Sequence, residues 1–458
     1  MSDASLSLFE SDHLTRLAQR ILAQARAQGA DAAEVMIAEG DSVEVQVRLG
    51  QVERLSKARE KGLGLRIFFG QRSASASTSD LTEASLERLV ADTCAMAKAV
   101  AEDASSGLPD AELMAKDFPD LDVYDPTTLT IDQEIRLARQ AEDAAMQADL
   151  RITNSEGADC AAGHSAVLLA NTHGFIGAHR SSSYSLSVTP VAVDPQGKGM
   201  QRDAWYTVGR KFRALDPPET VGREAARRTV RRLGARKIPT QKVPVVFDPE
   251  TARSLLGHLA SAVSGYAVYK GASFLIGQLG KSLAPEFIDI YDDGRLPGGL
   301  GSRPFDGEGL PTRKTPVVER GVLVNYLLDT YSGRKLGMPS TGNAARSIGE
   351  SPTVAPTNFY LAPGSASPED ILRSVKQGLY VTELIGFGVN MVTGDYSRGA
   401  VGIWIENGEL AYPVEEITIA GNLKRIFADI EIVGNDLVFR GRIASPTIKI
   451  REMMVAGE

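Results

Sequence analysis

A pattern that occurs twice in the first half of the chain most constrains the fold. Residues 10–103 contain a helical run of apolar residues, then strand-like runs of alternating apolar and polar residues, then a second helical run. Residues 129–235 repeat that order. Residues 104–128 between them are acidic, contain proline and have no period, so we predict a surface linker. Two similar units in series predict a duplicated helix–sheet–helix α+β domain over residues 1–240.

The strands of the first unit are predicted from alternation and from the glycines or charged residues that separate the runs. We expect them over residues 32–40, 42–60, 62–70 and 72–80. Residues 216–234 should form the last helix of the second unit. Its proline near the start and its glycine near the end are typical of helix termini.

The second half, residues 241–458, has a different character. It is rich in Gly and Pro and contains short alternating runs, so we predict a mostly β domain with a few helices. The segments "ENGEL" (406–410) and "GNDLV" (434–438) have the composition of hairpin turns. The predicted fold class is therefore α+β, with the duplicated domain first and the mostly β domain second.

Composition excludes several classes of function. The 50 Lys and Arg residues against 58 Asp and Glu residues give a net charge of −8, which argues against nucleic-acid binding because that needs a basic surface. Two cysteines, Cys94 and Cys160, are too few for a disulfide framework and fit a reducing compartment. The N-terminus lacks the features of a signal peptide, and no apolar run is long enough to span a membrane. We therefore expect a cytoplasmic protein with no membrane partner.

A helical segment in "SLLGHLASAVSGYAVYKGASF", residues 254–274, resembles the metal-binding helix of a zinc peptidase. Such a helix needs two histidines about one turn apart and a glutamate that activates water. Around His258, however, the residues one turn away are Ser254 and Ala262, and the next residue is Leu259. We interpret His258 as a packing residue and predict no catalytic residue and no metal ligand in this chain.

Other candidate sites have simpler interpretations. His164, His173 and His179 fall on consecutive predicted strands, but no cysteine or well-placed carboxylate joins them as a metal ligand. "GQLGKS" (277–282) fails as a phosphate-binding loop because the position that needs glycine is Leu275. "GGLGSRPFDGEG" (298–309) is a turn-rich loop, with the lining of a cavity as the alternative.

Two charged segments leave alternatives open. The basic run over residues 223–237 predicts a solvated helix face, with an acidic partner surface as the alternative. In "GDYSRGAVGIW" (394–404), Asp395, Tyr396, Ser397 and Arg398 lie between glycines. They indicate either a tight turn fixed by an Asp–Arg pair or a loop that faces a partner subunit or a peptide. Ser397 has no neighbouring base in the sequence, so nucleophilic catalysis is not supported.

Several segments together resemble the TldD/TldE (PmbA) family, and the chain resembles its TldE/PmbA branch over nearly its whole length. In this family a TldD-type and a TldE-type subunit are understood to form a heterodimeric zinc-dependent peptidase that acts on short or unfolded peptides. An older family label is modulator of DNA gyrase. The segments are "RITNSEGAD", "GHLASAVSGYAVYKGASF", "SRPFDGEGLPT", "YSGRKLGMPSTGNA", "VTELIGFGVNMVTGDYSRGAVGIWIENGELAYPVEEITIAGNL" and "VGND".

The resemblance implies that the catalytic subunit carries H-E-x-x-x-H and a C-terminal cysteine. Aligned on "KGASF", the two histidines would fall at Leu256 or Gly257 and at Ser261 or Ala262, and the C-terminal cysteine segment is missing here. We therefore expect a non-catalytic subunit that works with a TldD-type partner and unfolded or short peptides, with zinc held by the partner. The alternatives are a stand-alone homodimeric binding protein and an autonomous hydrolase whose metal site uses the strand histidines.

Overall fold

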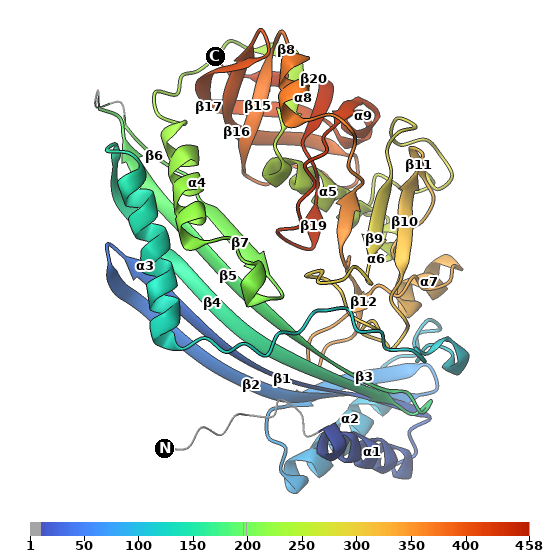
Figure 1. Ribbon diagram of the computed structural model, residues 1–458. Helices are drawn as coiled ribbons and strands as arrows, with labels where there is room; N and C mark the ends of the chain where they lie inside the picture. The colour runs from blue at the N-terminus through green and yellow to red at the C-terminus, as the bar shows by residue number, and fades with distance from the viewer. Residues whose placement is uncertain (1–10, 196, 198, 458) are drawn as a thin grey trace.

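The computed structural model describes residues 11–195, 197 and 199–457 (Figure 1). A long curved sheet with helices forms the N-terminal part, residues 11–240, and a mostly β C-terminal part, residues 241–457, lies on its concave side. This arrangement confirms the predicted α+β class. The prediction about a signal peptide falls mainly on residues 1–10, which lie outside the described residues.

The N-terminal part is built on one antiparallel sheet that takes strands from both predicted units. Its order is β3-β2-β1-β4-β5-β6, and β7 also pairs with β5. At about 3.3 Å per residue, the longest strand would extend roughly 65 Å. The strands are β1 (Ala32–Arg48), β2 (Gln51–Phe69), β3 (Arg72–Thr78), β4 (Ile152–Asn171), β5 (Ile176–Val193), β6 (Met200–Arg202) and β7 (Trp205–Gly209).

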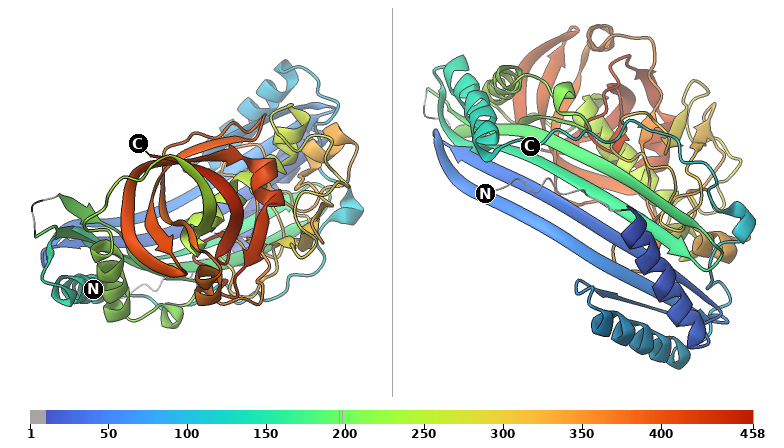
Figure 2. Two further views of the ribbon diagram at one scale, coloured as in Figure 1. Left: turned by 90° about the horizontal axis from the view of Figure 1, so that it is seen from above. Right: turned by 60° about the horizontal axis from the view of Figure 1, so that its bottom comes forward.

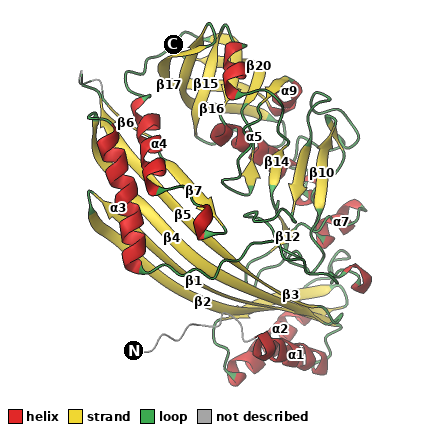
Figure 3. Ribbon diagram, viewed as in Figure 1, coloured by secondary structure: helices red, strands yellow, loops and turns green. Residues whose placement is uncertain are grey.

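Helices lie against this sheet at its two ends (Figure 3). Alternation along β1 explains the arrangement, because its odd-numbered residues all point to one face. Val35 and Ile37 pack against α1 (Ser11–Ala27) and α2 (Glu83–Ala99). Val45 and Val47 pack against α3 (Ile131–Ala148) and α4 (Pro218–Val230). The even-numbered residues are left to form the concave face.

The predicted strand over residues 42–60 is wrong, because it contains a two-residue turn at Leu49 and Gly50. Both residues have positive φ, 49° and 73°, and the backbone reverses there between β1 and β2. The backbone N–H groups of Leu49 and Gly50 donate to the Glu142 carboxylate of α3, at 2.9 and 2.8 Å. The expected break between residues 60 and 62 does not occur, since β2 continues through it.

The predicted surface linker, residues 104–128, is instead packed between the two parts of the chain. It includes a short 3-10 helix, η1 (Ala111–Leu113). Leu108, Met114 and Leu121 are buried. Its backbone bonds to both sides, since Ala115 N–H donates to Gly309 and Ser182 N–H donates to Val123. A second 3-10 helix, η2 (Phe212–Ala214), follows β7.

The main sheet of the C-terminal part closes into a ring (Figure 2). Its order is β17-β16-β15-β8-β20-β18, and an additional pairing of β17 with β20 completes the ring. The strands are β8 (Gln241–Phe247), β15 (Gln377–Ile385), β16 (Asp395–Glu406), β17 (Glu409–Asn422), β18 (Ile430–Val433) and β20 (Ile448–Ala456).

Smaller elements complete this part. A second sheet has the order β11-β10-β9-β14-β19, and β12 pairs with β13. These strands are β9 (Ile290–Asp293), β10 (Lys314–Glu319), β11 (Val322–Leu323), β12 (Ala344–Ala345), β13 (Thr353–Val354), β14 (Phe359–Leu361) and β19 (Ile443–Ala444). The helices are α5 (Pro249–Ala262), α6 (Gly265–Tyr269), α7 (Thr330–Leu336), α8 (Pro368–Arg373) and α9 (Leu423–Ala428).

One of the two predicted hairpin turns is confirmed. Asn407 and Gly408 have positive φ and join β16 to β17. The "GNDLV" prediction is wrong, because this segment leaves β18 without forming a hairpin. The Asp436 carboxylate accepts the backbone N–H and the hydroxyl of Thr447 instead. Among the described helices, none combines the length and the apolar character that crossing a bilayer requires.

Helix α3 buries two glutamates that differ in their partners. Glu142 accepts the two turn N–H groups described above. Glu134 is fully buried, and neither of its carboxylate oxygens has a hydrogen-bond partner among the described residues. Burial raises the pKa of Glu134 to about 7. The folded state therefore holds a proton at Glu134 that the unfolded chain releases at lower pH.

We predict that Glu134→Gln removes a pH-dependent loss of stability. In the native protein, stability should be full below the unfolded pKa of 4.5 and should fall as the pH rises through about 7. Above that pH the variant should be more stable by roughly 1–3 kcal/mol, and near pH 4 the two proteins should be equal. Urea unfolding at a series of pH values measures the difference.

Glu142→Gln is the matched control on the same helix. It places an amide donor against the N–H groups of the turn, so it should destabilise the protein at neutral pH. If the unfolding free energy of the Glu134→Gln variant depends on pH in the same way as that of the native protein, this account of Glu134 is wrong.

Candidate functional site

A cleft lies between the concave face of the N-terminal sheet and the C-terminal part. It consists of three adjoining cavities of about 830, 210 and 710 Å³. The first two share Ser165, Ser181 and Arg210 in their walls, and the last two share Arg442. We call the three together the cleft. Its size suits an extended ligand more than a single small molecule.

The floor of the cleft is made of small residues from neighbouring strands. Strand alternation places them on one face, where cross-strand partners stand side by side. Ser165 pairs with Ser181, for example, and their hydroxyl oxygens are 2.8 Å apart. Because these side chains are short, a ligand can approach the sheet closely. The floor residues are Ala38, Gly40, Ser42, Ala58, Gly163, Ser165, Ser181 and Ser183, with the longer side chain of Glu60 beside Gly40.

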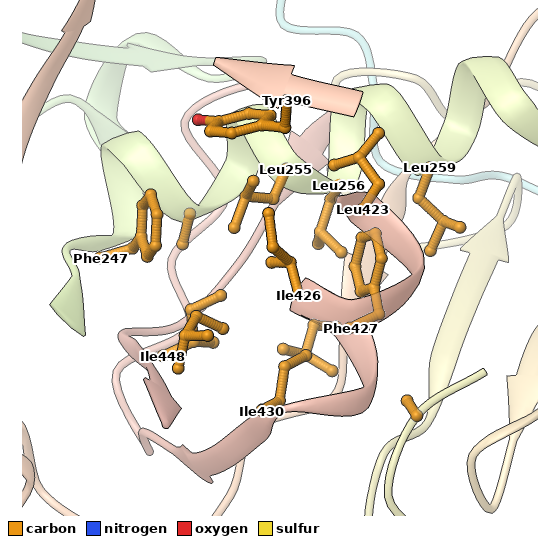
Figure 4. Packing of buried hydrophobic residues seen from close by; sticks show 14 of the residues in the cluster. Phe247, Leu255, Leu256, Leu259, Tyr396, Leu423, Ile426, Phe427, Ile430 and Ile448 are labelled. Atoms are coloured by element: carbon orange, nitrogen blue, oxygen red, sulfur yellow. The ribbon is translucent and has the colours of Figure 1, made fainter. Parts of the chain in front are cut away.

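Helix α5 forms the wall of the largest C-terminal cavity, and its sequence explains its orientation. The Asp248 side chain caps its start by accepting the Thr251 N–H at 2.8 Å, and Pro249 occupies the first turn. One face packs on the inner side of the ring through Leu255, Leu256 and Leu259 (Figure 4). The other face lines the cleft with Ser254, Gly257, His258 and Ser261.

His258 therefore faces the cleft and is not a core residue. Its ring lies 6.0 Å from that of Tyr396 in an edge-on arrangement. Its Nε2 is buried and accepts or donates no hydrogen bond among the described residues. Burial lowers the pKa of His258, and the Arg398 guanidinium lowers it further. The imidazole is consequently neutral near pH 7.

The four residues singled out in "GDYSRG" form the start of strand β16 and separate onto its two faces. Tyr396 is buried beside α5, and Arg398 donates to the Ser254 hydroxyl at 3.0 Å in the cleft. Asp395 and Ser397 are exposed on the other face. Asp395 accepts from Thr393 and Asn422, so it does not fix Arg398. Strand alternation brings Arg398 to the cleft and takes Asp395 and Ser397 away from it.

The three strand histidines do not converge. His164 is held on the convex side by Asp41 and by the Tyr184 hydroxyl, each at 3.2 Å. His179 lies on the concave side against Phe305, with ring centres 5.3 Å apart. Burial and the nearby Arg303 and Arg210 lower the pKa of His179 to about 4.

His173 follows β4, where its backbone N–H donates to the Asn171 side chain. Across residues 11–195, 197 and 199–457, no three side chains of His, Cys, Asp or Glu come together in a way that could hold a metal ion.

The basic run of residues 223–237 is only partly the solvated face that was predicted. Arg223 and Arg227 are exposed, but Arg228 and Arg232 are buried. Arg228 pairs with Asp203 and Asp248, and Arg232 pairs with Glu383. The acidic surface that receives this helix is thus partly supplied by the C-terminal part of the same chain.

Three arginines of the cleft were not predicted as site residues. Arg210, Arg303 and Arg442 share the wall of the 210 Å³ cavity. Each follows within two residues of a glycine, in a segment without strong periodicity. A nearby glycine in an aperiodic segment does not by itself identify an arginine as a site residue. The alternative interpretation of "GGLGSRPFDGEG" as the lining of a cavity is confirmed, since Leu300 to Gly307 contribute to the same wall.

Three domain comparisons place this chain in a class of metallopeptidases. Residues 33–97, 124–233 and 240–457 match domain 1, the central domain and the C-terminal domain of the PmbA/TldA metallopeptidases. The chain belongs to the PmbA/TldD metallopeptidase family, which confirms the resemblance seen in the sequence.

Individual relatives agree with this assignment. The chain is 41% identical to Metalloprotease PmbA of Escherichia coli over 428 residues, covering 93% of each chain. It is 38% identical to a PmbA homologue of Haemophilus influenzae, covering 93% of this chain and 92% of that one.

Solved structures show the same fold. A protein of Bacteroides thetaiotaomicron described as a modulator of DNA gyrase superposes with a TM-score of 0.91 at 28% identity, covering 98% of this chain and 100% of that chain. TldE of Thermococcus kodakarensis superposes with a TM-score of 0.83 at 21% identity, covering 97% and 99%.

The residues of α5 do not fit a zinc ion. Of the positions where the family's histidines would align, Leu256 and Ala262 are buried in the core, while Gly257 and Ser261 line the cleft. In either alignment one position therefore faces the core. His258 is the single imidazole on the cleft face of this helix, and a tetrahedral site needs at least three protein ligands.

We predict that Asp248→Ala is strongly destabilising, because Asp248 both caps α5 and pairs with buried Arg228 at 3.4 Å. Breaking a buried pair leaves an unpaired charge, so the loss should be about 3–5 kcal/mol in urea unfolding. Ser367→Ala removes a matched cap from α8 without a buried pair and should cost only about 1 kcal/mol. Equal losses in the two variants would show that the Arg228 contact contributes nothing.

Proposed function

We propose that this chain is a non-catalytic, TldE/PmbA-like subunit of a heterodimeric zinc-dependent peptidase that acts on short or unfolded peptides. The observation that carries the proposal is the cleft face of α5. It keeps the position of the family's metal helix but presents Ser254, Gly257, His258 and Ser261. No pair of these can ligate zinc beside a glutamate base. The zinc, the base and the hydrolysis would belong to a TldD-type partner.

The cleft supports a role in holding an extended peptide. Its floor consists mainly of glycine, alanine and serine, with Glu60 as a longer side chain, so a peptide backbone can lie close to much of the sheet. In the described part of the sheet, β3 pairs on one side with β2 and leaves its other edge open. An unfolded peptide can pair with such an edge through its backbone, whereas a folded protein cannot offer a free strand.

The proposed partner is supported by relatives on both sides of the family. The structural neighbour from Thermococcus kodakarensis carries the name TldE. A TldD homologue of Buchnera aphidicola is 30% identical over 218 residues, or 47% of this chain. A cytoplasmic location belongs to the same proposal and is supported by Cys94 and Cys160, which are both buried and unpaired.

We predict that peptide cleavage requires this chain together with a TldD-type subunit. The two chains are purified separately and mixed, and cleavage of an unfolded peptide is followed with and without a zinc chelator. Cleavage should appear in the mixture alone and should stop when the chelator is added. His258→Ala in this chain should leave the zinc content of the complex unchanged, because we assign no ligand to His258.

Two outcomes would favour the other hypotheses. Peptide binding by this chain without association with the partner would support a stand-alone homodimeric binding protein. Stoichiometric zinc in the isolated chain, with cleavage that is lost on changing His164, His173 or His179, would support an autonomous hydrolase.

A further inference from the structure

Three arginines of the cleft form a cluster in which none makes an ion pair with a described carboxylate. Arg210 comes from the end of β7, Arg303 from the loop before Phe305, and Arg442 from the residue before β19. Although these positions are far apart in the sequence, all three line one cavity of about 210 Å³. We call them the arginine cluster. It lies between the two larger cavities of the cleft.

The hydrogen bonds of the cluster go to neutral groups. Arg210 donates to the carbonyl oxygens of Ser182, at 2.8 Å, and of Leu300 and Gly299. Arg303 donates to the carbonyl of Ala344 at 2.9 Å, while its Nε is buried without a partner. The Arg442 guanidinium makes no hydrogen bond and no ion pair with any described residue. No described carboxylate comes within 4.0 Å of any of the three guanidinium groups.

Two buried arginines elsewhere in the chain pair with carboxylates. Arg346 donates to the Glu34 carboxylate at 2.6 Å, and Arg228 lies between Asp203 and Asp248. Asp306 lines the same cavity, but its carboxylate accepts the backbone N–H groups of Glu308, Leu310 and Ala344. The partly exposed arginines of the cluster therefore keep N–H groups that an anion in the cavity can bind.

Mutual repulsion within the cluster shows how close the charges lie. Burial lowers the pKa of Arg210 to about 10, and the positive charge of Arg442 adds to the effect. Burial also lowers the pKa of Arg303; the Asp306 carboxylate opposes this shift, and Arg442 adds to it. An anion placed among the three groups would remove this repulsion and satisfy the free N–H groups. The chain as a whole is acidic, with a net charge of −8, so the cluster is a local feature.

We propose that the arginine cluster binds a carboxylate group of a peptide that lies in the cleft. A guanidinium fork matches a carboxylate with two parallel hydrogen bonds. The carboxylate can be the C-terminus of the peptide or an Asp or Glu side chain, and the two sources share this chemistry. Leu169 and Phe305 in the same wall provide apolar contacts for an adjoining side chain. The inference rests on the proposed peptide-handling function.

Arg442 is the residue of the cluster best suited to a test. Its side chain is exposed and makes no hydrogen bond or ion pair within the described structure, so Arg442→Gln should fold normally. Arg210 ties the two parts of the chain together through carbonyl groups, and its loss would disturb the fold. Arg88 on α2 is exposed and lies far from the cleft, so Arg88→Gln is the matched control.

The experiment measures binding of labelled peptides to the full chain by fluorescence polarisation. Three peptides of one uncharged sequence are compared: the free acid, the C-terminal amide, and the amide with a single internal Glu. The free acid, the Glu peptide or both should bind about tenfold or more tightly than the plain amide. Arg442→Gln should weaken the affinity for these carboxylate peptides by about tenfold and leave the affinity for the plain amide unchanged. Arg88→Gln should change none of the three affinities.

The result assigns the source of the carboxylate. Preference for the free acid identifies the peptide C-terminus, and preference for the Glu peptide identifies a side chain. Equal binding of the three peptides, no binding of any, or equal weakening of all three by Arg442→Gln would overturn the proposal.

Failure of the inference is distinguishable from failure of the proposed function. The binding experiment uses this chain alone, whereas the proposed function is tested by cleavage with the partner. Cleavage of acid and amide peptides at equal rates by the complex, with equal binding here, would reject the arginine cluster and keep the subunit. Carboxylate-dependent binding without cleavage would keep the cluster and reject the subunit.

Discussion

Buried charge pairs that join the two parts of the chain fix the geometry on which the rest of the structure depends. Glu34 of the sheet accepts from Arg346 of the C-terminal part and from Arg66 of the neighbouring strand. Arg228 of α4 pairs with Asp248 of the C-terminal part. Such pairs add little stability compared with apolar packing, but removing one partner is costly, so they define the relative position of the two parts across the cleft.

The packed segment 104–128 contributes to the same constraint. It bonds to the sheet through Val123 and to the C-terminal part through Ala115. Arg334 of α7 donates to its carbonyl groups at Ser105 and Leu108. A segment predicted as a surface linker thus bonds to both parts of the chain. Its apolar residues are too irregularly spaced to reveal this, since no helix or strand period organises them.

The sequence predicted those elements whose structure depends on their own residues. The alternation in β1 and the apolar period of the long helices are visible in the sequence. The residues Asn407 and Gly408 can adopt the positive φ that their turn needs. The turn at Leu49 and Gly50 could not be predicted, because its N–H groups depend on Glu142, which is distant in the sequence. The same limit applies to the arginine cluster, whose members come from three separate segments. The lone His258 was recognised from the sequence, but its place on the cleft face required the structure.

Helix α5 has one face that packs in the core and one face that lines the cleft. Its apolar face and the Asp248 cap hold it in the ring, while its other face touches mainly the cleft. Substitutions along that second face therefore leave the core undisturbed. The residues that face a ligand can thus change in this helix while the packing that holds it in the ring is kept.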